Sequence, residues 1–167
     1  MAKRRKRSSA GLVLGAVAIL AGIAAAAMLF LPAVAVKDSE TTYTGLQIAF
    51  GYSEKLPVIG EVDIFKFSFM NLLTYILAVA GVLFAVAGAL ARGGKLLSFI
   101  AAAAFIASGV FFLLSPSFCI INDTVSSVIT LFGGNVAENL SLAVGSIVGA
   151  VAAFVAGAAQ LIKVIAK

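Results

Sequence analysis

Two groups of side chains in this 167-residue sequence have types and spacings that could do chemistry. Glu61 and Asp63 would lie on one face of a strand, and with Glu54 they are the best candidates for acid–base catalysis. Asn71, Thr74 and Tyr75 share one face of an expected helix, where they could shape a polar pocket. A solvated strand edge explains the carboxylates more simply, and capping or interfacial anchoring explains the polar cluster.

The residue types that are missing exclude most metal and redox chemistry. The chain has no His, no Trp and one cysteine, Cys119, so it can form neither an intramolecular disulfide nor a Cys/His site for zinc, haem or an iron–sulfur cluster. Cys119 could crosslink to another chain, but a small apolar residue at a membrane boundary is the simpler interpretation. We therefore expect no catalytic residues, no cofactor and no metal, and a protein that is not an enzyme.

The composition indicates that the solvent around most of the chain is lipid. Hydrophobic residues make up 62% and the mean hydropathy is +1.15, whereas soluble domains are roughly half apolar. Four apolar runs each reach the roughly 20 residues that cross hydrocarbon. The sequence predicts an all-α transmembrane fold: a four-helix bundle in one membrane domain, with a small β-hairpin or sheet in the first extracellular segment. The expected segments are a basic tail (1–8), helices at 10–36, 67–91, 96–114 and 139–162, outer segments at 37–66 and 115–138, a turn at 92–95 and a tail at 163–167.

Two alternating stretches predict the hairpin. Apolar and small or polar residues alternate over 46–52, and a second alternation surrounds Glu61 and Asp63, so two strands would be joined by residues 53–60. A lone hairpin is marginal in water, so it is expected to lean on the helix ends or on the second outer segment. The apolar stretch 125–132 of that segment could dip into the membrane interface.

Charge predicts the orientation. Nine of the twelve cations fall on one side of the four-helix arrangement, and all seven acids fall on the other. The positive-inside rule then predicts a multi-pass plasma-membrane protein with both termini in the cytoplasm, facing anionic lipid headgroups. The apolar run 8–36 is too long for a signal peptide, whose core spans roughly 7–15 residues, and its basic start is better explained by topology than by nucleic-acid binding. The expected topology and lipid contacts are Lys3, Arg4, Arg5, Lys6, Arg7, Arg92 and Lys95.

Small residues at every fourth position predict how the last helix packs. Ser141, Gly145, Gly149, Ala153 and Gly157 would form one helical face, and such faces let backbones approach closely in lipid. Packing within the bundle is the favoured interpretation, and a homodimer seam or a docking face for a larger partner is the alternative. No Asp, Glu, Lys or Arg falls inside the four expected spans, which argues against proton-coupled transport.

Four spans, cytoplasmic ends and a first outer segment with strands and Gly45-Leu46 resemble the claudin-like tetraspan proteins. Gln47 stands where claudins carry a Trp, and no cysteine follows in this segment, so the resemblance implies the architecture and transfers no functional residue. The stretches GLQIAFGY and FSFMNLL also resemble small uncharacterised four-helix membrane proteins of Gram-positive bacteria. We expect a structural, adhesion or accessory subunit that presents its outer segment and has a membrane-protein partner or forms a homo-oligomer. An oligomeric pore or small transporter with Asn71, Thr74 and Tyr75 near its mouth is the alternative.

Overall fold

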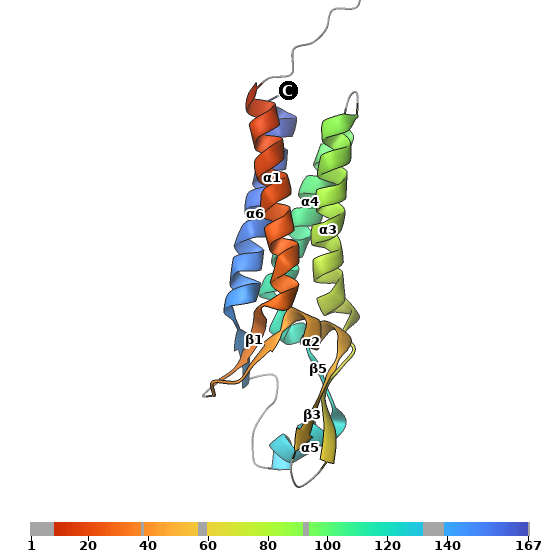
Figure 1. Cartoon of the computed structure of the whole chain (residues 1–167), viewed down its shortest axis with the longest axis vertical. Coiled ribbons are helices and arrows are strands. Elements are labelled where there is room, and N and C mark those ends of the chain that lie inside the picture. Colours follow the sequence, from red (N-terminus) through yellow and green to blue (C-terminus); the bar gives the residue numbers. More distant parts are fainter. Residues whose placement is uncertain (1–8, 38, 57–59, 92–93, 132–138, 167) are drawn as a thin grey trace, which may run out of the picture.

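Four long helices form the body of the molecule (Figure 1). The computed structural model describes residues 9–37, 39–56, 60–91, 94–131 and 139–166. Each helix packs mainly against two neighbours, in the ring α1–α3–α4–α6. All four are long and apolar enough to cross a membrane, α1 together with the short turn that follows it. The four-helix prediction is confirmed at this level, with α1 (Ser9–Ala27), α3 (Phe69–Leu90), α4 (Lys95–Leu113) and α6 (Val144–Ile165).

The bundle has two different ends (Figure 1). α1 begins and α6 ends at one of them, which we call the terminus end. The strands and short helices gather at the other, the sheet end. We call the described residues of 32–66 and 115–142 the cap, because they cover this end of the four helices.

Glycines and phenylalanine rings fill the interior of the bundle. The Phe105 ring lies between Gly22 and Gly81, so close that a Cβ built on either glycine would fall within 2.7 Å of it. Large apolar side chains point the other way, and Leu20 and Leu83 are 68% and 65% exposed. A soluble bundle would bury such leucines, whereas small residues inside and large ones outside are typical of helices packed in lipid.

The first helix is shorter than the sequence prediction of 10–36, which is wrong at its end. α1 stops at Ala27, a 3-10 turn η1 covers Met28–Phe30, and Pro32–Val36 form strand β1. Pro32 has no N–H for a helical bond and disfavours helical backbone at the residue before it, and Leu31 is extended (ψ 161°). Hydropathy alone did not separate a buried strand from the apolar helix before it.

β1 is the centre of the first sheet, whose order is β2-β1-β6. β2 (Thr42–Thr44) and β6 (Leu140–Leu142) both pair antiparallel with it. The prediction that the last helix begins at 139 is therefore wrong. Ser141 pairs with Ala35 and donates a 3.3 Å hydrogen bond to its carbonyl, so it belongs to a strand and not to the helical face.

The predicted strand over 46–52 is mostly a helix, which corrects the alternation argument. Gly45–Phe50 form α2, and Thr44 caps it: the Thr44 hydroxyl accepts from the Gln47 N–H while the Gln47 side chain accepts from the Thr44 N–H. This reciprocal pair is a capping box, which satisfies two helix-start donors. Seven residues of alternation are too few to outweigh it.

The predicted hairpin is present, but most of its first strand lies within residues 53–60, where the loop was expected. β3 (Tyr52–Leu56) pairs with β4 (Gly60–Lys66), and the connection 57–59 lies outside the described residues. β4 also pairs with β5 (Ile120–Ile121), so the prediction that the hairpin leans on the second outer segment is confirmed. That segment also holds η2 (Ser115–Phe118) and α5 (Asp123–Leu131); most side chains of the stretch 125–132 lie outside the description, so its interfacial position stays a prediction.

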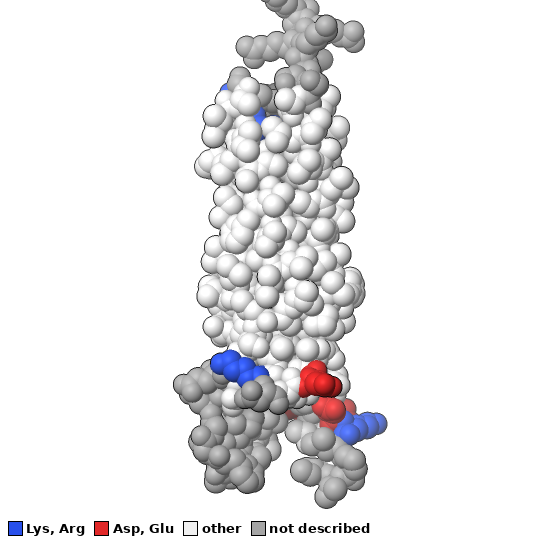
Figure 2. All heavy atoms as spheres, turned by 90° about the vertical axis from the view of Figure 1, so that its left-hand side faces the viewer, with Lys and Arg blue, Asp and Glu red and all other residues white. Residues whose placement is uncertain are grey.

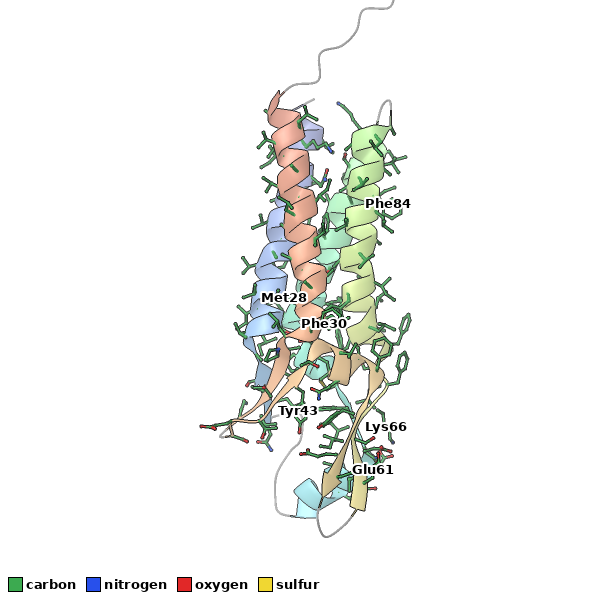
Figure 3. The ribbon with its side chains drawn as sticks, viewed as in Figure 1. Met28, Phe30, Tyr43, Glu61, Lys66 and Phe84 are labelled. Atoms are coloured by element: carbon green, nitrogen blue, oxygen red, sulfur yellow. The ribbon has the colours of Figure 1, made fainter. Side chains whose placement is uncertain are left out.

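Aromatic rings join the two sheets of the cap. Tyr43 of β2 points toward the hairpin (Figure 3), and its ring meets Phe65 of β4 edge-on at a centroid distance of 4.7 Å. Burial, followed by the nearby Glu54, raises the pKa of Tyr43, which favours its neutral form. At the surface the Lys66 ammonium lies 2.6 Å from the Asp123 carboxylate, holds the pKa of Asp123 below its usual value and links β4 to α5.

Candidate functional site

The three polar residues singled out on α3 lie at its cap end, inside the protein. Asn71 and Thr74 are each 1% exposed and Tyr75 is 5% exposed. They face α4, η2 and α2 of their own chain, so within the described residues they do not line the mouth of a pore. The sequence placed them on one helical face, and the structure shows that this face points inward.

Tyr75 holds α2 against the bundle. Its ring packs edge-on against Phe112 of α4 at a centroid distance of 5.2 Å, and its hydroxyl lies against Gly45. A Cβ on Gly45 would fall 2.0 Å from that hydroxyl oxygen, so only glycine fits at the start of α2. Gly45 was noticed in the sequence only through the claudin-like Gly-Leu.

Thr74 takes part in a link between α3 and α4. Its hydroxyl donates to the Met70 carbonyl at 3.1 Å, one turn back in α3. Its own carbonyl accepts a 2.8 Å hydrogen bond from the Ser108 hydroxyl of α4. Ser108 is fully buried, and this bond satisfies the hydroxyl without a partner from outside the chain.

A hydrogen-bonded set of five side chains connects the cap to the bundle, and we call it the junction network: Ser68, Asn71, Ser115, Cys119 and Ser146. Ser68 caps α3 by accepting from the Asn71 N–H, and its hydroxyl donates to the Phe118 carbonyl at 2.6 Å. The Ser68 N–H donates to the Ala49 carbonyl of α2 at 3.0 Å. One residue thus ties α2, α3 and η2 together.

The network continues to the last helix through two buried hydroxyls. The Ser115 and Ser146 oxygens lie 2.9 Å apart, so η2 is bonded to α6. Cys119 donates through its sulfur to the Ser115 carbonyl at 3.4 Å and accepts weakly from the Asn71 amide at 3.8 Å. Burial raises the pKa of the Cys119 thiol to about 12, and the Asn71 bond offsets this only in part. A thiol that stays protonated at neutral pH is a poor nucleophile, so Cys119 serves as a packing residue here.

The small residues of α6 are covered within the chain. A Cβ on Gly145 would fall 2.5 Å from the Pro32 carbonyl oxygen of β1, and one on Gly149 would fall 2.7 Å from the Phe112 ring. Ala153 is fully buried, and Gly157 faces Ile106 of α4. The contacts of these four residues therefore match the intramolecular interpretation of the face.

The cap carboxylates lie along an exposed hairpin. Glu61 is opposite Lys55 in the ladder, far from the bundle (Figure 3), and Asp63 accepts a hydrogen bond from the Ser53 hydroxyl. Glu54 is opposite Val62. Among the residues that the structure describes, no group of three or more His, Cys, Asp or Glu could hold a metal ion. This arrangement fits a solvated strand edge.

Charged groups lie at the two ends of the bundle. On the face in Figure 2, the middle of the described helical surface is uncharged, a few Lys or Arg atoms show near the terminus end, and both acidic and basic side chains lie at the sheet end. Lys95 is exposed at the terminus end. The other proposed lipid contacts, Lys3, Arg4, Arg5, Lys6, Arg7 and Arg92, lie outside the described residues.

One cation is not where the sequence prediction put it. Lys163 was assigned to a tail at 163–167, but α6 continues to Ile165 and Lys163 is only 4% exposed. Its ammonium lies 3.5 Å from the Gln160 carbonyl oxygen and faces Gly15 of α1. The expectation that no charged residue lies within the four spans is therefore wrong at this residue.

Sequence reasoning also missed two buried polar side chains, Gln160 beside Lys163 on α6 and Ser98 on α4, whose hydroxyl lies against Gly88 of α3. The Gln160 amide nitrogen and the Ser98 hydroxyl make no hydrogen bond within the part of the chain that the structure describes. The spacing of Gln160 and Lys163, three positions apart near the end of the last apolar run, could have indicated that the two side chains lie on one helical face. No family model matches this chain, and no curated protein or solved structure matches it either.

Proposed function

We propose that this chain is a multi-pass protein of the cell membrane with both termini in the cytoplasm, and that it is a non-enzymatic structural, adhesion or accessory subunit that presents its cap outside the cell. Four apolar helices with leucines turned outward support insertion. The cations of the sequence at the terminus end and its acids at the sheet end support the orientation. The resemblance to claudin-like tetraspan proteins remains a hypothesis about this architecture.

The observation that carries the proposal is the junction network. Ser68 and Ser115 bond α2 and η2 to the ends of α3 and α6, so the cap is fixed to the bundle rather than tethered to it. The Asn71 side-chain oxygen has no partner among the described residues, but the other side chains of the network bond one another or nearby carbonyls, and such bonds hold a single arrangement. A rigid cap presents a defined surface, which is what recognition of a partner by this end would require.

The alternative of an oligomeric pore or small transporter has less support. Asn71, Thr74 and Tyr75 are buried within one chain, and their hydrogen bonds and ring contacts go to neighbouring elements of that chain. A mouth lined by these residues would need the cap to leave the bundle. Solute flux through liposomes that contain the purified protein, abolished by Asn71→Leu, would favour the pore.

Orientation can be tested with single cysteines in a Cys119→Ala background. Glu40→Cys places a thiol on the exposed cap, and Lys95→Cys places one at the terminus end. We expect a membrane-impermeant maleimide to label residue 40 on intact cells and residue 95 only after permeabilisation. The reverse pattern would overturn the proposed orientation.

The subunit role is tested by purification in mild detergent and identification of what co-purifies. Charge reversal of the hairpin by Glu54→Lys and Glu61→Lys should release a partner that binds the cap, and Leu83→Ala on the outward face of α3 is the matched control. Loss with Leu83→Ala alone would place the contact within the membrane. Absence of any partner together with flux in liposomes would contradict the subunit role.

A further inference from the structure

We propose that one side of the cap lies in the lipid of the outer leaflet, through an apolar surface formed by α2 and the start of α3. We call this surface the apolar patch, and its members are Leu46, Phe50, Phe67, Phe69 and Met70. The inference rests on the proposed function, because it takes the helices to span a membrane with the cap outside. It adds a depth: on this side the cap enters the boundary between acyl chains and headgroups and does not stand clear of the membrane.

All five side chains of the apolar patch are large, apolar and exposed. Their exposed fractions range from 42% at Leu46 to 54% at Phe50 and Phe69. The Phe50 and Phe67 rings are neighbours, with a centroid distance of 6.5 Å. Exposed apolar side chains that cluster in this way mark a surface that meets lipid or another protein.

The fold of α2 turns two members of the patch outward. α2 buries Ile48 and Ala49 completely against the protein. Leu46 and Phe50 are four positions apart and share the other face of this short helix. Because the Ser68 N–H donates to the Ala49 carbonyl at 3.0 Å, α2 is held beside the start of α3. The two segments therefore present one surface.

Ser68 also explains why two phenylalanines of the patch point the same way. It is the N-cap of α3, its side chain is buried, and its backbone is extended (φ −117°, ψ 104°). Side chains alternate along extended backbone, so Phe67 and Phe69 point away from Ser68 and out of the protein. The bonds that fix Ser68 in the junction network thus also fix the direction of both rings.

The apolar patch continues a stripe that runs the length of α3. Phe69, Ile76, Leu83 and Leu90 follow one another at intervals of seven residues, which keeps them close to one face of the helix. Their exposed fractions lie between 46% and 74%. The 22 residues of α3 rise about 1.5 Å each and span about 33 Å, which matches the roughly 30 Å of hydrocarbon in a bilayer. A stripe that faces lipid along this length ends at Phe69, so Phe67 lies at the next level out.

Charge marks where this apolar surface ends. No Asp, Glu, Lys or Arg occurs in the two segments that supply the patch, 41–53 and 67–91. Lys66 comes directly before Phe67, and its ammonium pairs with the Asp123 carboxylate. In Figure 3, Lys66 lies beyond the end of α3 and Glu61 lies farther out still. The order of apolar stripe, phenylalanine rings and charge follows a bilayer from its core to its headgroups, so lipid is the occupant that fits the patch.

The absence of Trp from the sequence provides a direct test, because one introduced Trp reports its own surroundings without background. Phe50→Trp places the probe in the apolar patch. Val79→Trp, at an exposed position about halfway along α3, and Glu61→Trp, on the exposed hairpin, are the controls. Each full-length variant is placed in phosphatidylcholine nanodiscs whose acyl chains carry bromine either near the headgroups or near the bilayer centre. Bromine quenches a Trp at its own depth, and acrylamide quenches a Trp that water reaches.

We expect shallow bromines to quench Phe50→Trp at least about two-fold more strongly than deep bromines, because the apolar face of an interfacial helix lies roughly 5–10 Å into the boundary of headgroups and acyl chains. Val79→Trp should show the reverse order, and Glu61→Trp should respond to acrylamide alone. Quenching of Phe50→Trp by acrylamide and by neither bromine would overturn the inference. Failure of deep bromines to quench Val79→Trp would instead contradict the membrane proposal, so the two failures are separable.

A protein that covers the apolar patch is the competing occupant. A Phe50→Trp protein shielded from acrylamide and from both bromines would show that a second copy of the chain covers the patch, and it would also overturn the inference. Phe67→Trp repeats the measurement from the other segment of the patch and should give the same result. Trp replaces one aromatic ring by another in both variants, so their melting temperatures should match the wild type and identify the quenching as a property of the native fold.

Discussion

The two ends of the bundle differ in how their buried hydroxyl groups are bonded. At the sheet end, Ser68, Ser115 and Ser146 have their hydroxyls bonded to carbonyls or to one another. At the terminus end, the Ser98 hydroxyl and the Gln160 amide nitrogen have no partner among the described residues, as is also true of the Asn71 side-chain oxygen at the sheet end. The helices are the same four at both ends, and at the sheet end the partners of the hydroxyls come partly from η2.

This contrast separates two uses of polarity in an apolar protein. A satisfied network adds roughly 1 kcal/mol per hydrogen bond and fixes one geometry, while a buried donor without a partner costs about 1–3 kcal/mol. The hydroxyl bonds of the junction network therefore contribute to stability, and the following changes test the contrast between the two ends in order of decreasing effect.

The largest effect is expected from adding one methyl group at each end. Gly45→Ala would place a Cβ 2.0 Å from the Tyr75 hydroxyl, in contact with the backbone of Leu29, and should lower the free energy of unfolding by about 2–3 kcal/mol. Gly15→Ala is the matched control, because among the described residues its Cβ would meet only the flexible end of Lys163, at 3.4 Å. Denaturation of the purified protein in detergent measures both. Equal stability of the two variants would contradict the tight fit of α2 on Tyr75.

The next comparison removes one buried hydroxyl from each end. Ser115→Ala deprives Ser146 of its partner and should destabilise the chain by about 1–2 kcal/mol. Ser98→Ala removes a hydroxyl with no partner among the described residues, so its effect should be neutral or stabilising. Unfolding midpoints in detergent measure both variants. A larger loss from Ser98→Ala than from Ser115→Ala would contradict the contrast between the two ends.

Alkaline pH offers a smaller and reversible test of the junction network. Because burial raises the pKa of Cys119 from 9.0 to about 12, the unfolded chain loses the thiol proton first as pH rises above 9. The folded state gains nothing below pH 9 and is weakened above it, by about 1.4 kcal/mol at pH 10. The measurement compares wild type with Cys119→Ala at pH 8 and pH 10. An identical pH dependence in both proteins would place the thiol in water rather than in the network.

The smallest effect should come from the surface of the cap. Lys66→Met removes the ion pair with Asp123, which is almost fully exposed and screened by solvent. We expect a shift in melting temperature close to the scatter of repeat measurements, and a slight loss of protection from proteolysis in α5. The pair lowers the pKa of Asp123, so its contribution is present at neutral pH and is lost as pH falls below the ordinary value of 3.8. A shift in melting temperature as large as that of Ser115→Ala would show that this exposed ion pair stabilises the protein as much as the buried Ser115–Ser146 hydrogen bond does.

The two middle helices, α3 and α4, could be predicted closely from the sequence because each is a long apolar run with clear ends. Ser68 and the Arg92–Lys95 turn bound α3 closely, and the prediction of 67–91 is within two residues of the structure. The cap was harder to predict, because strands β1 and β6 have the same hydropathy as the helices beside them. The two segments are strands because they pair with each other, for example at Val34 and Leu142, and no local sequence pattern shows that pairing.

The candidate site was predictable in part. The helical face of Asn71, Thr74 and Tyr75 followed from spacing, but whether it faced water or protein depended on η2 and α2, which arrive from other parts of the chain. Lys163 was misplaced because a charge was assumed to end the helix. The side chain instead lies along the gap at Gly15, where a residue without a Cβ leaves room for it.

The central strand of the cap also sets an order of events during synthesis. One edge of β1 pairs with β2, which follows it closely in the sequence. The other edge pairs with β6, which is synthesised much later, and the Ser141 hydrogen bond to Ala35 spans 106 residues. Until the ribosome has made residues 140–142, that edge of β1 has no strand beside it from β6 and is open to pairing with other strands. A nascent chain halted after α4 would therefore carry a half-built sheet, and a quality-control protease would have a recognisable signal that the last helix has not yet arrived.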